Sequence, residues 1–222
     1  MDLNTCRALC KSAFKENIKP AFYLQSFALL LLLSYYFLPA TKFIWNGVSE
    51  LKKEYGLFFI ASVPVICGGF IPLLILLYKR KIKRDQIFSN ILFCVFFWSY
   101  RGTEINFLYD FFAYLFGDST QPMVIIKKVL CDQFIYSFLW SGPTAAVLFK
   151  WKANKFIWAT TLKDLNMKFF TEEMAATIFA IWLVWIPAVT IIYILPLELQ
   201  YVMFNIVLCF FSLILSSIQK DS

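Results

Sequence analysis

The sequence predicts an all-α, polytopic membrane protein: a bundle of about six transmembrane helices, with both termini on the same, inside face. Of its residues, 60% are hydrophobic and 16% are charged, whereas an average soluble domain is about 45–50% apolar and about 25% charged. The apolar residues form long runs without the alternation of barrel strands, and helices satisfy every backbone amide inside lipid.

Each apolar run has a length near the roughly 17 to 25 residues that cross a hydrocarbon core as a helix. The six predicted spans are residues 21–40, 57–78, 88–116, 123–149, 174–195 and 200–218. Residues 1–20 are predicted to form a basic amphipathic segment on the membrane surface, and residues 21–222 a single helical domain. We expect the first span to be retained, because the polar leader is long and the run that follows has the length of a full span.

The distribution of Lys and Arg predicts the orientation. With the N-terminus inside, fifteen of the 21 basic residues fall in inside segments and five in outside segments, and such an excess marks the inner face. The densest group, here called the basic segment, follows the second span and is expected to meet anionic lipid. It contains Lys79, Arg80, Lys81, Lys83 and Arg84. Lipid and orientation account for the net charge of +7, so we expect no nucleic-acid partner.

The sequence contains no histidine, which excludes several kinds of active site. Ser-His and Cys-His pairs, HExxH zinc sites and haem ligation through imidazole all need one. The six cysteines form no CxxC pair, and Gly68-Gly69, inside an apolar run, favours close helix packing over a phosphate loop. We therefore expect no catalytic residue, no metal, no cofactor and no enzymatic activity.

Charged residues interrupt the third predicted span. Arg101 and Glu104 are three residues apart, so on a helix they share a face and can pair, and Asp110 follows them. A charge at the bilayer centre costs at least about 2.5 to 3.5 kcal/mol, so such residues usually pair or line a wet cavity. The alternative is a span that ends near Tyr100, a polar turn at 101–106, and an interfacial helix after it.

The fourth predicted span begins with polar residues. If its helix starts at Met123, Asp132 lies in the third turn, four residues after Lys128 and next to Gln133, where an intramembrane ion pair can form. If the helix starts near Asp132, that residue is an N-cap.

Four residues are predicted to bend or break helices: Gly142, Pro143, Pro187 and Pro196. Proline lacks a backbone N–H and leaves a carbonyl that a neighbouring helix or water must satisfy. Pro196 lies between the last two spans and predicts a tight helical hairpin.

Several fragments resemble, in order and spacing, the Mpv-seventeen type family of peroxisomal and mitochondrial membrane proteins. Residues 127–133 are similar to its Lys-x-x-x-Asp-Gln signature. The family also has an element of a glycine, a histidine and a Trp-Tyr pair at fixed spacing. This chain keeps the spacing with Gly102, Asn106, Leu108 and Tyr109, where Asn106 replaces the histidine and Leu108 the tryptophan.

The resemblance covers about residues 57–219 and includes departures. Pro196 followed by residues 211–216 is similar to a closing Pro and Trp-x-x-Tyr-Leu-Ser pattern, with Phe for Trp. The Trp-Pro-x-x-Gln-x-x-Asn-Phe element is represented only by Trp-Ile-Pro at 185–187, and Phe70 stands where an acidic residue is expected. Residues 1–50 have no clear counterpart.

The resemblance implies a mitochondrial inner or peroxisomal membrane and a weakly selective pore for ions or small metabolites; a bacterial cytoplasmic membrane is the alternative location. The first hypothesis is a channel or small-solute transport protein with a polar path through Arg101, Glu104, Asp132 and Gln133. The second is a noncatalytic membrane scaffold or assembly factor, and the third a substrate-binding subunit of a multicomponent transporter. A homo-oligomer is compatible with each.

Overall fold

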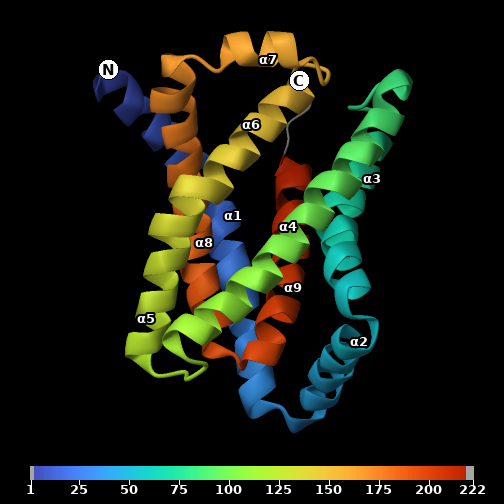
Figure 1. Ribbon diagram of the computed structural model, residues 1–222, viewed down its shortest axis with the longest axis vertical. Coiled ribbons are helices and arrows are strands. Elements are labelled where there is room, and N and C mark those ends of the chain that lie inside the picture. The colour runs from blue at the N-terminus through green and yellow to red at the C-terminus, as the bar shows by residue number, and fades with distance from the viewer. Residues whose placement is uncertain (1–2, 219–222) are drawn as a thin grey trace. The chain divides into compact units, whose positions relative to one another are not determined.

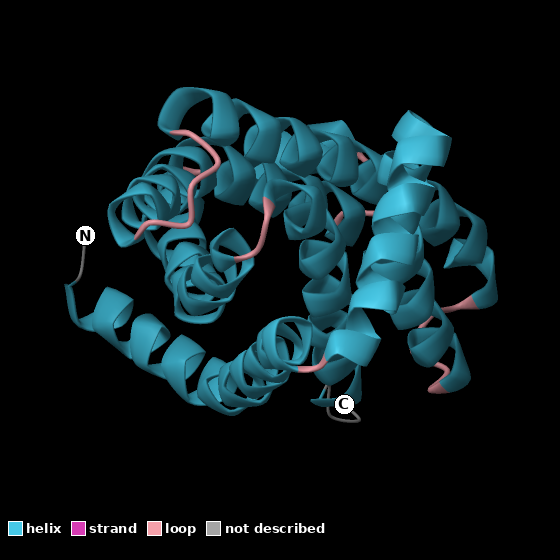
Figure 2. Ribbon diagram, turned by 90° about the horizontal axis from the view of Figure 1, so that it is seen from below, coloured by secondary structure: helices cyan, strands magenta, loops and turns pink. Residues whose placement is uncertain are grey.

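The computed structural model describes residues 3–218, and every regular element in that range is helical (Figures 1 and 2). The all-α class is thus confirmed for the described part of the chain. The α-helices are α1 (Leu3–Phe37), α2 (Pro39–Pro64), α3 (Ile71–Tyr78), α4 (Ile87–Phe116), α5 (Pro122–Leu130), α6 (Gly142–Ala153), α7 (Trp158–Asp164), α8 (Met174–Ile194) and α9 (Leu197–Ile218). Three π-helical segments, η1 (Val65–Phe70), η3 (Cys131–Ser141) and η4 (Phe169–Glu173), and a 3-10 turn, η2 (Arg84–Gln86), connect some of them.

Within residues 3–218, four helical runs are long and apolar enough to cross a membrane. They are Asn17–Phe37, Pro39–Tyr78, Phe169–Ile194 and Leu197–Ile214. These runs overlap the first, second, fifth and sixth predicted spans. Helix α1 continues through residue 20, where the sequence suggested the end of a surface segment.

The third and fourth predicted spans are helical but are not among these four runs. Helix α4 carries Arg101, Glu104 and Asp110, and the run formed by α5 and η3 carries Lys128 and Asp132, which lower the apolar character of both. The number of six spans and the inside location of both termini therefore stay predictions.

The chain divides into two compact units, each described by itself below. Unit 1 comprises Met1–Gln25 and Ile126–Thr190, and unit 2 comprises Ser26–Ile125 and Ile191–Ser222. The sequence had suggested one helical domain over residues 21–222.

Helix α2 bends at Gly56. Its first residue is Pro39, whose fixed φ suits a helix start. Gly56 has φ of 50° and ψ of −125°, a conformation that only glycine adopts at low cost. The bend comes directly before residue 57, where the second span is predicted to begin, whereas the apolar helical run as a whole begins at Pro39. The preceding segment, expected as an outside connection, is helical instead.

Unit 2 is built around α9, which packs against α2, η1, α3 and α4. Residues on every side of α9 are buried over positions 199–205, as in a helix surrounded by neighbours. The Trp98 ring of α4 covers Gly68 and Gly69, where an added Cβ would lie 2.7 Å and 2.9 Å from it. The two glycines therefore serve the close packing that the sequence indicated.

The crossing of α2 and α4 depends on Gly102. An added Cβ there would clash with Pro64 Cγ and lie 2.5 Å from the Ile60 carbonyl oxygen. Pro64 has no N–H to donate to Ile60, four residues earlier. The Tyr201 hydroxyl donates to that carbonyl instead, at 2.5 Å, from α9. One side chain thus satisfies the backbone group that the proline leaves open.

Unit 1 contains the long π-helical segment η3, followed directly by Pro143. The Gly142 N–H donates to the Ser137 carbonyl, five residues earlier, so the wider π register continues up to the proline. Gly142 also allows close packing on α8, because an added Cβ would lie 2.8 Å from the Ser137 oxygen and 3.2 Å from Ile178. Gly142 and Pro143 thus mark a change of helical register rather than a break.

The other two proline predictions have different outcomes. Pro187 lies inside α8, which runs from Met174 to Ile194, so the helix is not broken there, and a bend at Pro187 stays a prediction. Gln25 Nε2 donates to the Val184 carbonyl at 2.6 Å, one turn before Pro187. Pro196 separates α8 from α9, as the predicted hairpin requires.

Replacing Tyr201 by Phe is expected to destabilise the protein by about 1 to 3 kcal/mol, because the buried Ile60 carbonyl loses its donor. The thermal unfolding midpoint in detergent measures this. Tyr114→Phe, at a position 87% exposed on α4, is the matched control and should change the midpoint little. Equal midpoints for both variants would contradict the proposed role of the hydroxyl.

Candidate functional site

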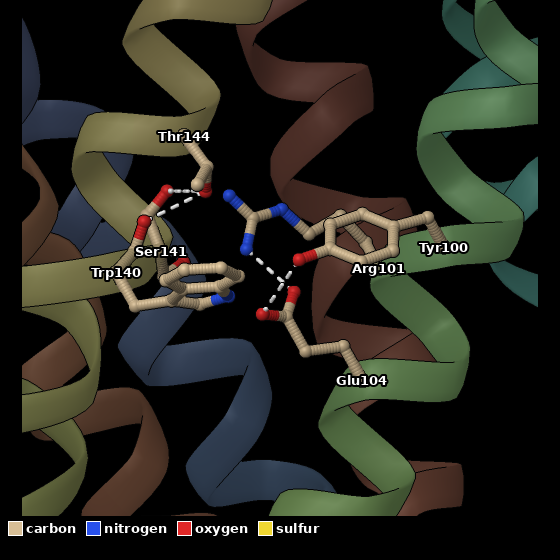
Figure 3. A network of polar contacts seen from close by, with 6 residues as sticks. All are labelled: Tyr100, Arg101, Glu104, Trp140, Ser141 and Thr144. Carbon is tan, nitrogen blue, oxygen red and sulfur yellow. Dashed lines mark hydrogen bonds and ion pairs between the residues drawn. The ribbon is translucent and has the colours of Figure 1, made fainter.

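Arg101 and Glu104 form an ion pair on α4 (Figure 3). Arg101 Nη1 lies 2.7 Å from Glu104 Oε2, as the three-residue spacing predicts. Helix α4 runs without interruption from Ile87 to Phe116, so the alternative of a polar turn at 101–106 is wrong. A helix makes the pair because positions three apart lie on neighbouring points of its surface.

Aromatic rings surround this ion pair. The side chains of Arg101 and Glu104 are only 7% and 14% exposed. The Arg101 guanidinium carbon lies 5.4 Å from the Phe97 ring centre and 5.7 Å from that of Tyr100. The Tyr100 hydroxyl donates to Glu104 Oε1 at 3.2 Å. Both charges are therefore removed from water and held by charge pairing, hydrogen bonding and cation–π contact.

Asp110 has a different environment. It is exposed, and it accepts a hydrogen bond from Asn106 Nδ2 at 3.1 Å. Lys52 of α2 lies within Coulombic range of Asp110 and Glu198, and its ammonium lies 5.0 Å from the Tyr201 ring centre. Asp110 lies nine residues after Arg101, which corresponds to a rotation of about 180° around the helix axis. Its side chain therefore points away from the face that carries Arg101. Asp110 is thus not part of the Arg101–Glu104 pair.

In unit 1, the predicted polar residues are buried on one helical run. Lys128, Asp132 and Gln133 are 1%, 4% and 1% exposed. Helix α5 begins at Pro122, so Asp132 lies in the third turn and the N-cap alternative is wrong. Lys128 and Asp132 are four residues apart, which places both on one face; their ion pair stays a prediction.

Gln133 anchors this polar group to α8. Its Nε2 donates to Asp132 Oδ1 at 2.8 Å, and its backbone carbonyl accepts from Trp182 Nε1 at 2.9 Å. The Trp182 ring also packs on Phe134, with ring centres 4.8 Å apart. Asp132 and Gln133 are therefore held in place by contacts within their own unit.

Apart from Gln133, which the sequence indicated, the sequence interpretation missed a set of amide side chains whose oxygen atom is buried. Each donates its nitrogen to an oxygen of its own unit, while its side-chain oxygen has no hydrogen-bond partner. The set consists of Gln25, Asn106, Gln133, Gln200 and Asn205. Amide residues inside apolar helical runs were the available signal. Among residues 3–218, no group of three His, Cys, Asp or Glu side chains comes together as a metal would need.

Comparison with known proteins gives no relative. No protein-family model, no curated protein and no solved structure matches this chain. The resemblance to the Mpv-seventeen type family therefore stays a prediction from short fragments.

Replacing Glu104 by Gln is expected to lower the free energy of unfolding by about 3 kcal/mol, because the buried Arg101 guanidinium loses the carboxylate that lies 2.7 Å from it. Chemical or thermal unfolding in detergent measures the loss. The double variant Arg101→Met, Glu104→Met should recover at least half of it, since apolar side chains replace both charges. A double variant less stable than Glu104→Gln would contradict this explanation, because removing both charges would then cost more than removing one.

Proposed function

We propose that this protein is a multi-pass membrane protein that lets small solutes or ions cross the bilayer along buried polar side chains. The observation that carries the proposal is the burial of charged residues on helices of an otherwise apolar chain: Arg101 with Glu104 in unit 2, and Lys128 with Asp132 in unit 1. Ionisable groups at membrane depth are costly, and their usual role is to form ion pathways, proton relays or substrate sites.

The competing function is a scaffold in which polar residues only hold helices together. Such a role is best served when every buried polar atom has a partner, because an unpaired one costs about 1 to 3 kcal/mol. Gln133 Oε1 is buried without a partner, although its amide nitrogen and its backbone carbonyl are both bonded. A buried acceptor beside Asp132 is a polar group that a solute can meet, and it supports transport over packing alone.

The host membrane is proposed from the resemblance alone, as mitochondrial inner or peroxisomal. In the described range 3–218, four helical runs long and apolar enough to cross a bilayer support a membrane location in general.

Purified protein in liposomes is expected to increase permeation of potassium chloride and small sugars, measured by light scattering after an osmotic step. Asp132→Asn should slow permeation about tenfold, equivalent to about 1.4 kcal/mol in the barrier, while the protein stays folded. Asp118→Asn, an exposed carboxylate between α4 and α5, is the control and should leave the rate unchanged.

Wild-type liposomes that are no more permeable than empty ones, with a working pore protein in parallel, would rule out transport. If Asp132→Asn instead unfolds the chain or releases a copurifying membrane protein, the scaffold function is favoured.

We also propose that the basic segment binds the headgroups of anionic phospholipids. Arg80, Lys83 and Arg84 are exposed. Tyr78 and Phe88, on either side of the segment, are 89% and 70% exposed, as aromatic residues at a membrane interface are. Each basic residue close to an anionic surface contributes about 1 kcal/mol of attraction.

Protein carrying Lys81→Gln, Lys83→Gln and Arg84→Gln is expected to retain less phosphatidylglycerol than wild type, with phosphatidylcholine unchanged, as measured by native mass spectrometry. The control removes three exposed lysines elsewhere: Lys42, Lys127 and Lys163. Equal loss of phosphatidylglycerol in both variants would mean that net charge, not this segment, attracts the lipid.

A further inference from the structure

The connection between α6 and α8 contains a short helix that lies across the end of unit 1. Helix α7 comprises Trp158–Asp164, and Figure 1 shows it at the ends of α6 and α8 with its axis across theirs. The candidate membrane run Phe169–Ile194 begins five residues after α7 ends. Five residues of extended chain reach at most about 18 Å. With this run in a bilayer, chain continuity keeps α7 close to the bilayer surface.

Contacts within unit 1 fix the inner side of α7. The Trp158 ring stacks on that of Trp151 in α6, with ring centres 4.9 Å apart. Asn154 Nδ2 donates to Asp164 Oδ2 at 2.8 Å, which joins the residue after α6 to the last residue of α7. Thr161, between these two contacts in the sequence, is fully buried. Helix α7 therefore has a defined side that faces outward.

The outer side of α7 changes from apolar to polar around the helix. Each residue turns the helix by about 100°. Measured from Trp158, the exposed side chains lie at about 40° for Leu162, about 100° for Ala159, about 140° for Lys163 and about 200° for Thr160. Trp158 and Leu162 are 46% and 65% exposed. An apolar arc next to a basic and polar arc is typical of helices that lie in the plane of a membrane interface.

The residues on both sides of α7 extend this surface. Ile157, before the helix, is 52% exposed, and Met167, after it, is 76% exposed. Lys155 and Lys168 are also exposed. Long lysine side chains can reach lipid phosphates while apolar neighbours enter the layer below them. Chain continuity brings a bilayer to this surface in every copy of the protein, so lipid is the occupant that the arrangement favours.

We propose that residues 157–168 form an interfacial anchor, in which Ile157, Trp158 and Leu162 enter the boundary between the headgroups and acyl chains of a phospholipid bilayer. This surface is distinct from the basic segment. Apolar contact holds it, so neutral phosphatidylcholine is sufficient. The inference rests on a membrane location and does not depend on transport.

Photo-crosslinking of the full-length protein in phosphatidylcholine liposomes tests the anchor. p-Benzoylphenylalanine, encoded in place of Leu162, should give a mass increase of one phosphatidylcholine molecule after ultraviolet irradiation, as measured by intact-protein mass spectrometry. The matched control places the same group at Thr160, which is also exposed on α7 but lies about 160° around the helix from Leu162. We expect several-fold less lipid adduct from position 160, because that side faces water.

Hydrogen–deuterium exchange in the same liposomes gives a second measurement. A helix of seven residues is too short to be stable by itself, so its amides exchange slowly only where contacts hold it. Leu162→Asp should raise the exchange rate of residues 158–164 several-fold, since a carboxylate does not enter the apolar layer. Thr160→Asp should leave the rate nearly unchanged.

The outcomes separate the anchor from other roles of this surface. Equal lipid adducts from positions 160 and 162, or none from position 162, would overturn the anchor. An adduct between two copies of the chain at position 162 would also overturn it, in favour of self-association. Equal exchange in the two Asp variants would contradict the role of Leu162. Liposome permeation decides transport independently, so a failure of either proposal leaves the other standing.

Discussion

The packing of unit 2 depends on giving the Ile60 backbone carbonyl a donor where Pro64 removes the helical one. Helices in apolar surroundings have no water to satisfy an open carbonyl. The Ile60 carbonyl, which Pro64 leaves without a donor, receives the Tyr201 hydroxyl, and this bond joins α2 to α9 across the place where α4 passes. Gly102 makes room for it. Three residues that are far apart in the sequence therefore form one contact between helices: Pro64, Tyr201 and Gly102.

The sequence predicted the helical class and the places of four apolar runs within residues 3–218, since composition and run length depend on the solvent that a chain must face. It did not predict the bend at Gly56 within α2 or the π-helical register of η3. A glycine in a helical run is compatible with a straight helix, and only tertiary contacts select another backbone state. The continuity of α4 was also open, because Arg101 and Glu104 suit a turn until they pair.

The candidate site was predictable where spacing alone brings residues together. Arg101 and Glu104 were identified because three residues on a helix bring two side chains to one face. Asp110 follows on the same helix and was grouped with them, but it is exposed and bonds Asn106. The burial of Asn106 and Asn205 was beyond the sequence, because it depends on the neighbouring helices that cover them.

The bend at Gly56 has a consequence for bilayer thickness. The run Pro39–Tyr78 has 40 residues, about 60 Å of straight helix and twice a typical hydrocarbon core. The part after Gly56 is about 33 Å long, which fits that core with a slight tilt. Gly56 thus turns the charged part of this run, which carries Glu50, Lys52, Lys53 and Glu54, away from the direction of the apolar part, so a substitution that straightens the bend would extend the apolar rod with charged side chains.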